Sequence, residues 1–589
     1  MFGLRWLCFY ATTAGLTAGL RSLHSFASKI GEQEYFMKTA ISNPQADRHL
    51  HWFQEARFGM FLHWGPYSQL RRGEWVKVRD QIPDADYTRM ADGWRAEAYD
   101  PDAWARTAVA AGMRYVVLTT KHCDGFCLFK TATTDFCAPR RGPGRDLIEP
   151  YVAACRRHGL KVGFYFSLCD WHHPDFLAHY APTDIAAWGK PMPDAAAMAR
   201  YVELHHRQVR ELMTQYGPVD LLWFDANYLG PQVMRSAELV AMVRSLQPQI
   251  VINDRSGLPE DYATPEGVLA PVAPARTWEL CDGTHIGWGI EADEPALYSP
   301  VSELVGRLAD CAGAGGNFLL NIGPQADGQF PSCVHDQLRR LGEWVARHRE
   351  AIYGTVAGPT GRQSWGVSTQ CGDTVYLINF EPARSLRVRG WQSRIRAARL
   401  LDGGDRVGFC QNADGLDLEI PRLDPLATVV ALTLAEPPVV TPGLPAPEVD
   451  GRIVLPANRA QITGTKLYCN CDALGGRLCF WSEAADTAHW RFEVPTAGRF
   501  MVQIEYSNTP DAAGSRFAVT VAGDRLEAIA QSSGSWFQFR RDDLGLLNLS
   551  TGPQTLTITP VQMLTVGLMC LRRIVLTPQS NTSNTNQEN

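Results

Sequence analysis

A short apolar run that ends in an acid constrains this chain most. Residues 219–225 read VDLLWFD, and turn residues bound the run, with Gly217-Pro218 before it and Pro231 after it. A nearly continuous apolar run of this length is typical of a strand buried on both faces, as in a parallel sheet. If that sheet closes into a barrel, catalytic groups belong at the carboxyl ends of its strands. Asp225 would lie there, although a lone aspartate at a strand end is equally well explained as a helix cap.

The surrounding region alternates short apolar strands with amphipathic helices. Helical spacing of apolar residues occurs at Val209, Leu212, Met213 and Tyr216, and again between residues 301 and 308. This alternation predicts an α/β fold with a (β/α)8-like TIM barrel, and it leaves an open doubly wound sheet as the alternative. No GxGxxG segment opens a helix after the first strand, so a dinucleotide-binding fold has little support. The predicted strands are 60–64, 115–120, 161–167, 221–225, 250–255, 277–281 and 317–322.

Two β-rich regions follow the predicted barrel. At 589 residues the chain is too long for one hydrophobic core. Alternating apolar and polar residues predict a small β-sandwich and then a further β-rich, jelly-roll-like domain, with a proline-rich linker between them. For the last domain, carbohydrate binding and simple packing on the barrel both stay open. The predicted boundaries are a presequence at 1–30, the catalytic barrel at 31–358, the C-terminal β-sandwich at 359–436, the linker at 437–449, the β-rich domain at 450–578 and a disordered tail at 579–589.

The amino-terminal segment resembles a secretory signal peptide. A basic start and a moderately apolar stretch precede Ser25-Phe26-Ala27, which fits a small-x-small cleavage site. This predicts a secreted or periplasmic protein. Arg21, His24 and Lys29 break the uncharged region that usually precedes cleavage. A transit-like presequence or an uncleaved anchor therefore stays open, and with it a cytoplasmic or organellar location.

Polar and aromatic side chains gather at the carboxyl ends of the predicted strands. Several such ends converging on one mouth are hard to explain as stabilising devices, because loops build that face of a barrel. The residues are His63, Trp64, Lys121, His122, Asp124, Tyr165, Asp170, Asp225, Asn253, Asp254, Arg255, Trp278 and Glu279. Carboxylates, histidines, arginine and tryptophans suit glycoside hydrolysis, where hydrogen bonds and an aromatic face hold a sugar ring.

Other classes of site have less support in the sequence. It contains no GxSxG elbow, phosphate-binding loop or HExxH segment. A net charge of −6 gives no electrostatic reason to expect nucleic-acid binding. His172-His173 and His205-His206 raise the question of a metal, but adjacent histidines seldom ligate one ion. We therefore predict neither a metal nor a cofactor.

Several motifs resemble, in the right order, those of the α-L-fucosidases of glycoside hydrolase family 29. The first is RFGMFLHWGPYS at 57–68, followed by Glu74-Trp75. The next are VLTTKHCDGFCLF at 117–129, KVGFYFSLCDWHHPD at 161–175, LWFD at 222–225, NDR at 253–255 and NFLLNIGPQADG at 317–328. The resemblance covers residues 50–355, and the region 360–435 is similar to the small β-domain that follows the barrel in that family.

The resemblance implies a retaining exo-glycosidase that removes terminal α-L-fucose from oligosaccharides or glycoproteins. By the family pattern Asp225 is the nucleophile. The run DYATPE at 261–266 makes Glu266 the general acid/base, with Glu279 and Glu260 as rivals, since the chemistry needs two carboxyl groups flanking one bond. By the same match, the residues that hold the fucose ring are His63, Glu74, Trp75, His122, Tyr165, Trp223 and Arg255.

The chain departs from the family pattern at two positions. Cys123 stands where the common motif has a second histidine, and a thiol is a weak hydrogen-bond donor. Phe166 stands where tyrosine or histidine is more frequent. Both departures concern affinity and linkage preference. Two rival functions stay open: a non-catalytic glycan-binding protein on the same fold, which the presence of both Asp225 and Glu266 argues against, and a related retaining exo-glycosidase of the α-galactosidase type.

Overall fold

The computed structural model describes most of the chain after residue 45. The described residues are 46–175, 194–267, 276–285, 287–291, 298–363, 365–441, 447, 450–464, 466–472, 475–510, 512–534, 536, 538–564 and 567–579. The predicted presequence and most of the predicted tail lie outside this part of the chain.

A parallel sheet forms the centre of the first region. Its strands are β1 (Phe58–Leu62), β2 (Tyr115–Lys121), β3 (Lys161–Ser167), β4 (Leu221–Asp225), β5 (Val251–Ile252), β6 (Glu279–Gly283) and β7 (Asn317–Ile322). They lie in the order β5-β4-β3-β2-β1-β7-β6, and every neighbouring pair is parallel. Nearly every residue of these strands is buried, as expected for strands covered on both faces.

An irregular segment, residues 261–267, bridges the two edges of this sheet. On one side the Asp254 N–H donates to the Tyr262 carbonyl oxygen over 3.0 Å, next to β5. On the other side the N–H groups of Glu279 and Cys281, in β6, donate to carbonyls of the segment over 2.9 and 3.2 Å. The segment thus occupies the remaining position of a barrel-like ring, and the predicted α/β barrel class is confirmed.

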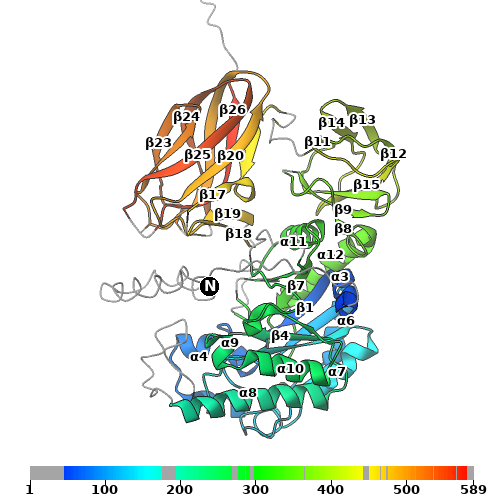
Figure 1. Cartoon of the computed structure of the whole chain (residues 1–589), viewed down its shortest axis with the longest axis vertical. Helices are drawn as coiled ribbons and strands as arrows, with labels where there is room; N and C mark the ends of the chain where they lie inside the picture. The colour runs from blue at the N-terminus through cyan, green and yellow to red at the C-terminus, as the bar shows by residue number, and fades with distance from the viewer. Residues whose placement is uncertain are drawn as a thin grey trace, which may run out of the picture.

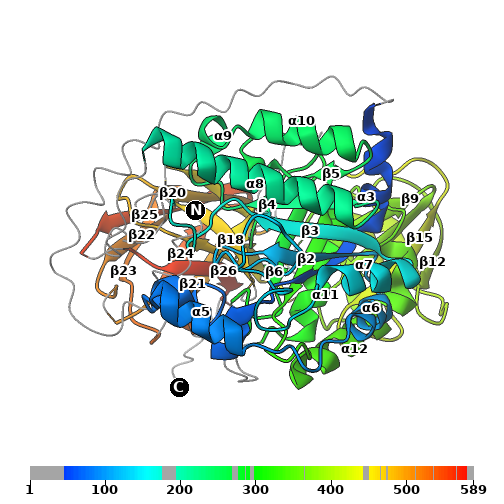
Figure 2. The same cartoon turned by 90° about the horizontal axis from the view of Figure 1, so that it is seen from below.

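Helices lie on the outside of the parallel strands (Figures 1 and 2). The longer ones are α5 (Asp84–Gly93), α6 (Pro101–Ala110), α7 (Ile148–Arg157), α8 (Ala195–Gln215), α10 (Ser236–Leu246), α11 (Val301–Gly313) and α12 (Ser332–His348). Short helices are α3 (His51–Ala56), α4 (Val76–Arg79) and α9 (Gly230–Val233). The predicted apolar stripes at 209–213 and 301–308 are buried in α8 and α11, which confirms them.

Predicted and observed strand limits agree for β3, β4 and β7. The observed β1 lies two residues earlier than predicted, β6 lies two residues later and β2 ends one residue later, while β5 is much shorter. The prediction extended that strand over 250–255, whereas the chain leaves it after Ile252 and makes a single 3-10 turn at Asp254–Ser256. The Asn253 side chain explains the difference. Its amide accepts from the Phe224 N–H and donates to the Phe224 carbonyl, both over 2.9 Å, so a side chain replaces the backbone ladder.

The next region is built from antiparallel strands. One sheet has the order β12-β15-β10-β9-β8 and the other β11-β14-β13. Apolar side chains from both sheets form one core, including Val375, Leu377, Val388 and Leu416. The strands are β8 (Val356–Ala357), β9 (Gly366–Cys371), β10 (Thr374–Asn379), β11 (Ser385–Arg389), β12 (Ile395–Leu400), β13 (Gly408–Asn412), β14 (Gly415–Glu419) and β15 (Thr428–Leu434).

The last region is again antiparallel. Its sheets have the orders β18-β19-β26-β21-β24, with β16 beside β26, and β17-β20-β25-β22-β23. The prediction of a further β-rich region is confirmed. The strands are β16 (Ile453–Pro456), β17 (Gln461–Thr463), β18 (Tyr468–Asp472), β19 (Gly475–Cys479), β20 (Thr487–Val494), β21 (Gly498–Ser507), β22 (Arg516–Val521), β23 (Asp524–Ile529), β24 (Phe539–Leu549), β25 (Gly552–Gln562) and β26 (Cys570–Pro578).

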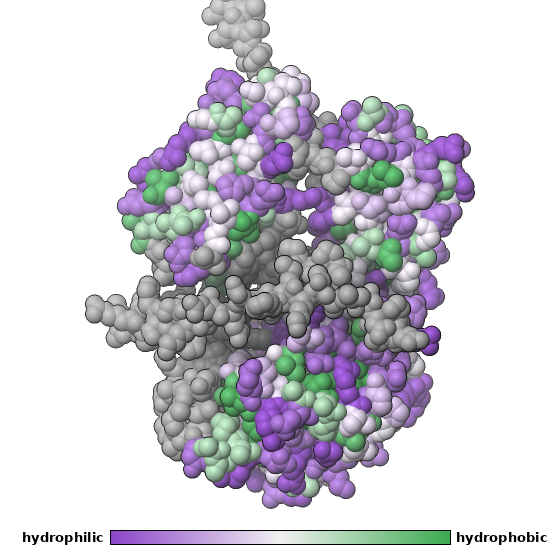
Figure 3. Space-filling view, viewed as in Figure 1, coloured by the Kyte–Doolittle hydropathy of each residue, from purple (hydrophilic) through white to green (hydrophobic). Residues whose placement is uncertain are grey.

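The visible faces of both β-rich regions carry mostly hydrophilic and weakly polar residues (Figure 3). Small apolar patches are scattered among these residues. Among the described residues, no helix has both the length and the apolar character that a membrane span requires. The predicted domain boundaries remain predictions.

Candidate active site

A pocket opens at the carboxyl ends of the parallel strands. Its walls combine aromatic side chains with a few polar and charged groups, the composition typical of small-molecule sites. All nine residues predicted for the catalytic and sugar-binding site line it. The full lining is Phe61, His63, Glu74, Trp75, His122, Cys123, Tyr165, Trp223, Asp225, Tyr228, Arg255, Glu266 and Trp288.

The backbone explains why residues far apart in the sequence meet here. His63 and His122 directly follow β1 and β2, while Tyr165 and Asp225 lie towards the ends of β3 and β4. The carboxyl ends of parallel strands share one edge of the sheet, so these side chains converge. Glu266 comes from the bridging segment 261–267, which brings it to the same mouth without a strand of its own.

Arg255 joins the two predicted catalytic carboxylates. Its Nη1 donates to Asp225 Oδ1 over 3.1 Å, and its Nη2 donates to Glu266 Oε2 over 2.9 Å. The Tyr165 hydroxyl donates to the other oxygen of Asp225 over 2.8 Å. Burial alone would lower the pKa of Arg255, but Glu266 and Asp225 raise it well above its ordinary value. The guanidinium therefore stays charged and holds two carboxyl groups at adjacent nitrogens.

The rival acids do not reach this pocket. Glu260 pairs with Arg244 over 2.7 Å on the outer side of the barrel segment and does not line the cavity. Glu279 is 0% exposed and lies behind the pocket wall, where it accepts a hydrogen bond from Trp223 Nε1 over 3.0 Å. Of the three candidates for a general acid, Glu266 is the one that shares a cavity with Asp225.

The two histidines of the pocket are neutral. Burial lowers the pKa of His63 well below its ordinary value and that of His122 to about 3. The Asn321 amide donates to the Trp288 carbonyl, so its oxygen accepts from His63 Nδ1 over 2.7 Å. This fixes the His63 tautomer and leaves Nε2 as an acceptor. His122 Nδ1 is buried and has no hydrogen-bond partner among the described residues.

Glu74 also carries an unsatisfied atom into the pocket. Its Oε2 accepts from the Gly289 N–H over 2.7 Å, whereas Oε1 is buried without a hydrogen bond among the described residues. Burial raises the pKa of Glu74 to about 7. Buried polar atoms are normally satisfied. Unsatisfied polar atoms on Glu74 and His122 in one concave site therefore indicate a ligand rich in hydroxyl groups, which can both donate and accept.

The two departures from the family pattern have different consequences. Cys123 lines the pocket, and its Sγ lies 3.1 Å from Ser167 Oγ. Phe166 does not line the pocket, so its predicted influence on sugar affinity is not direct. Its ring faces the outer side of the sheet, with Lys121 Nζ 4.4 Å from the ring centroid.

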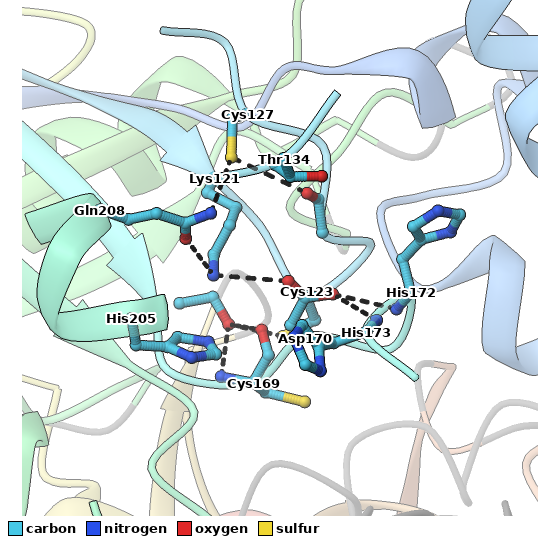
Figure 4. Close-up of polar contacts among 12 residues, drawn as sticks. Lys121, Cys123, Cys127, Thr134, Cys169, Asp170, His172, His173, His205 and Gln208 are labelled. Atoms are coloured by element: carbon cyan, nitrogen blue, oxygen red, sulfur yellow. Dashed lines mark hydrogen bonds and ion pairs between the residues drawn. The ribbon is translucent and has the colours of Figure 1, made fainter. Parts of the chain in front are cut away.

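A buried charged cluster supports the strand ends that carry these residues (Figure 4). Lys121 Nζ lies 3.6 Å from Asp170 Oδ2 and donates to Gln208 Oε1 over 3.0 Å. Asp170 Oδ1 accepts the N–H groups of His172 and His173, each over 3.0 Å. Burial would raise the pKa of Asp170, but Lys121 and the nearby histidines hold it below its ordinary value. The cluster ties the end of β2 to the loop after β3 and so fixes the backbone of His122.

Phe61, Tyr228 and Trp288 also line the pocket, although the sequence analysis did not assign them to it. Phe61, in β1, precedes His63 by two residues, and the alternation of an extended chain places both side chains on one face. Trp288 stands between two glycines, an unusual setting for a large aromatic residue. No group of three metal-binding side chains is present among the described residues.

Comparison with known proteins identifies the family. The family model described as Alpha-L-fucosidase matches residues 24–350, more than half of the chain. The chain belongs to the α-L-fucosidase family. It is 30% identical over 362 residues to the tissue alpha-L-fucosidase of Rattus norvegicus, covering 55% of this chain and 72% of the relative. Against the human tissue alpha-L-fucosidase the identity is also 30%, over 56% of this chain and 74% of the relative.

Solved structures agree with this membership. The alpha-L-fucosidase isoenzyme 1 from Paenibacillus thiaminolyticus is 37% identical and superposes with a TM-score of 0.62 over 66% of this chain and all of that one. The fucosidase from Vibrio sp. strain EJY3 shares the fold over 91% of this chain and 98% of its own, with a TM-score of 0.73 at 23% identity. A Bacteroides thetaiotaomicron fucosidase, 26% identical with a TM-score of 0.60 over 67% of this chain and 97% of that one, is a trapped covalent intermediate with 2-fluoro-fucosyl fluoride. The fucosidase described here is accordingly a retaining α-L-fucosidase, and no finding favours the two rival functions.

Proposed function

We propose that Asp225 is the nucleophile and Glu266 the general acid/base of a double displacement that releases terminal α-L-fucose. One observation carries the assignment: a single guanidinium, that of Arg255, contacts both carboxyl groups inside one pocket. Retaining glycosidases need two carboxyl groups about 5–5.5 Å apart, on either side of the scissile bond. Adjacent nitrogens of one planar group suit that spacing.

In the first step the Asp225 carboxylate attacks the anomeric carbon while the Glu266 carboxyl donates a proton to the leaving oxygen. Hydrogen bonds from Tyr165 and Arg255 hold both oxygens of the Asp225 carboxylate and orient it. In the second step the Glu266 carboxylate takes a proton from water, which displaces fucose from Asp225. Glu266 must be protonated at the start, so its ion pair with Arg255 has to loosen when the sugar and its leaving group enter.

The remaining pocket residues would hold the fucose ring. Glu74 Oε1 and His122 Nδ1 are buried polar atoms without a hydrogen bond among the described residues, and sugar hydroxyls, which donate and accept, can satisfy both. Trp75, Trp223 and Trp288 supply aromatic surface for the apolar face of the ring. His63 Nε2, left free by the tautomer, is a further acceptor.

The decisive experiment compares two substitutions on aryl α-L-fucosides. Asp225→Ala is expected to abolish turnover. Glu266→Ala is expected to slow turnover less when the leaving group is good, and added azide should restore the rate by replacing water as the second nucleophile. An Asp225→Ala variant with wild-type activity, or a Glu266→Ala variant that azide leaves unchanged, would refute the assignment.

The natural substrates that fit this site are fucosylated oligosaccharides or glycoproteins, and the amino-terminal segment fits a secreted or periplasmic protein. Release of free fucose from defined α1,2-, α1,3-, α1,4- and α1,6-linked oligosaccharides would give the linkage. Mass spectrometry of the mature protein is expected to miss the first ~27 residues. An intact Met1 would contradict secretion by a cleaved signal.

A further inference from the structure

A carboxyl group that does not reach the sugar pocket lies directly behind its wall. Glu279, the first residue of β6, is fully buried inside the barrel ring. Its Oε1 accepts from Trp223 Nε1 over 3.0 Å, and its Oε2 accepts a short hydrogen bond from the Tyr115 hydroxyl. The proposed mechanism gives this group no chemical step, although it is the rival acid that lies nearest to the site.

Trp223 connects Glu279 to the catalytic groups. The Arg255 guanidinium lies over the Trp223 ring, 4.5 Å from its centroid, and the Tyr165 ring stacks on Trp223 at 5.6 Å with an interplanar angle of 20°. Arg255 and Tyr165 are also the two residues that hydrogen-bond to Asp225. The Trp223 indole thus packs against both residues that hydrogen-bond to the proposed nucleophile.

Stacking alone does not fix this indole. Contacts across the face of a ring set its plane, but they depend only weakly on how its edges are placed within that plane. The hydrogen bond from Nε1 removes this freedom, because it ties one edge of the indole to a fixed acceptor. The carboxyl oxygen of Glu279 is a strong acceptor for this buried N–H.

We propose that Glu279 is a positioning residue: it fixes the Trp223 indole and thereby holds Arg255, and with it Asp225 and Glu266, in the reactive arrangement. The inference rests on the proposed roles of those two carboxyl groups. Glu279 itself touches neither the sugar nor the scissile bond. Its own pKa, which burial raises to about 7, is consistent with a dry interior position.

Three variants test this on 4-nitrophenyl α-L-fucoside. Glu279→Leu removes the acceptor. Glu279→Gln keeps the shape, since its amide oxygen can accept from Trp223 while its N–H donates to the Tyr115 oxygen. Trp223→Phe removes the donor but keeps a ring under Arg255. The matched control is Tyr115→Phe, which removes the other hydrogen bond to Glu279 and leaves the one to Trp223.

The readout is turnover per competent site, with sites counted by a 2-fluoro-fucosyl fluoride that traps the nucleophile. Displacing catalytic groups by a fraction of an ångström to one ångström costs up to about 100-fold, so we expect Glu279→Leu to lower kcat per site about 10–100-fold with KM within about threefold. Glu279→Gln and Tyr115→Phe should stay within about threefold of wild type. In a Trp223→Phe background, Glu279→Leu should lower kcat per site little further, because the effects of substitutions at two coupled residues do not add.

Two outcomes would overturn the proposal. One is a Glu279→Leu enzyme with fewer competent sites but normal kcat per site, the result of a purely structural role. The other is a double variant whose kcat per site falls by the full product of the fold-changes of Glu279→Leu and Trp223→Phe, which would mean that the two residues act independently. Should Glu279→Leu not fold, Trp223→Phe decides alone, and normal kcat per site in that variant refutes the inference. If instead the proposed roles of Asp225 and Glu266 are wrong, the Asp225→Ala variant will retain activity, which distinguishes that failure from failure of this inference.

Discussion

Two buried carboxylates, one at the barrel mouth and one in the C-terminal sheets, have opposite environments. Glu74 bonds to one backbone N–H, keeps an unsatisfied oxygen, and has its pKa raised by burial to about 7. Glu505, on β21, accepts from Arg541, Arg572 and Arg573 over 3.0, 3.3 and 2.9 Å. Burial would raise its pKa, but Arg573 and Arg541 hold it below its ordinary value.

The difference separates a group that supports the fold from a group that awaits a ligand. Arginines surround Glu505, so it gains nothing from a hydroxyl group that approaches. Glu74 gains a hydrogen bond only when a ligand arrives, because burying a polar atom without a partner is unfavourable until then. Asp225 and Glu266 lie between these cases, since they share one cation.

The largest effect should come from removing the cation that Asp225 and Glu266 share, because both carboxyl groups would then be as poorly paired as Glu74. Arg255→Met removes the shared cation while keeping much of the side-chain volume. We expect kcat/KM on aryl fucosides to fall about 10²–10³-fold, comparable to loss of one preorganised donor in an active site. Arg255→Lys should recover only part of this, because an ammonium does not present two parallel N–H groups. Activity within tenfold of wild type in Arg255→Met would mean that the two carboxyl groups do not depend on Arg255.

Glu74→Gln tests whether the unsatisfied oxygen serves the sugar. A hydrogen bond to a charged group contributes about 1.5–3 kcal/mol, so we expect fucose, measured as a competitive inhibitor, to bind about 10–100-fold more weakly. Gln337→Leu, which removes a buried polar group remote from the pocket, is the control. Unchanged affinity for fucose in Glu74→Gln would assign Glu74 to the fold rather than to the ligand.

The pH dependence of stability should carry the signature of Glu74. A carboxyl group whose pKa is raised in the folded state contributes stability that is present below its ordinary pKa and is lost as the pH rises through about 7. Glu74→Gln lacks this loss. Relative to wild type, the variant should therefore gain up to about 3 kcal/mol between pH 4.5 and pH 8, read as thermal midpoints without ligand. Parallel curves for the two proteins would contradict the raised pKa.

The smallest effect is expected at Glu505. Glu505→Gln should cost about 1 kcal/mol at neutral pH, because its three arginines are partly exposed and solvent screens them. Its pKa is lowered in the folded state, so this stability is present above the ordinary pKa and is lost as the pH falls through the lowered one. The difference from wild type should thus disappear in acid, while kcat/KM on aryl fucosides stays unchanged. A marked loss of activity would link this sheet to the pocket.

Much of the site was predictable because it follows strands. An apolar run with an acid at its end gave β4 and Asp225 directly, and β3 and β7 have the predicted limits. The orientation of Phe166 was also accessible in principle, since neighbours in a strand face opposite sides and Tyr165 faces the pocket. The family motif marks Phe166 only as a departure in residue type and carries no information on the face its side chain takes.

Other features depend on contacts that leave no local pattern. The early end of β5 follows from the Asn253 amide replacing the ladder opposite Phe224, a pairing of distant residues. The bridging role of 261–267 has no strand-like alternation to reveal it. The unsatisfied atoms of Glu74 and His122 emerge only when every neighbour is placed, because burial and hydrogen bonding are properties of the packed chain.

The irregular segment at 261–267 has a consequence for how related chains diversify. A nucleophile at the tip of a regular strand is locked by the register of its neighbours, and a one-residue slip would turn it to the wrong face. A residue on a stretch held by a few isolated backbone bonds tolerates insertions and deletions nearby far better. The position proposed for the proton donor can thus shift along the sequence more easily than the position proposed for the attacking aspartate.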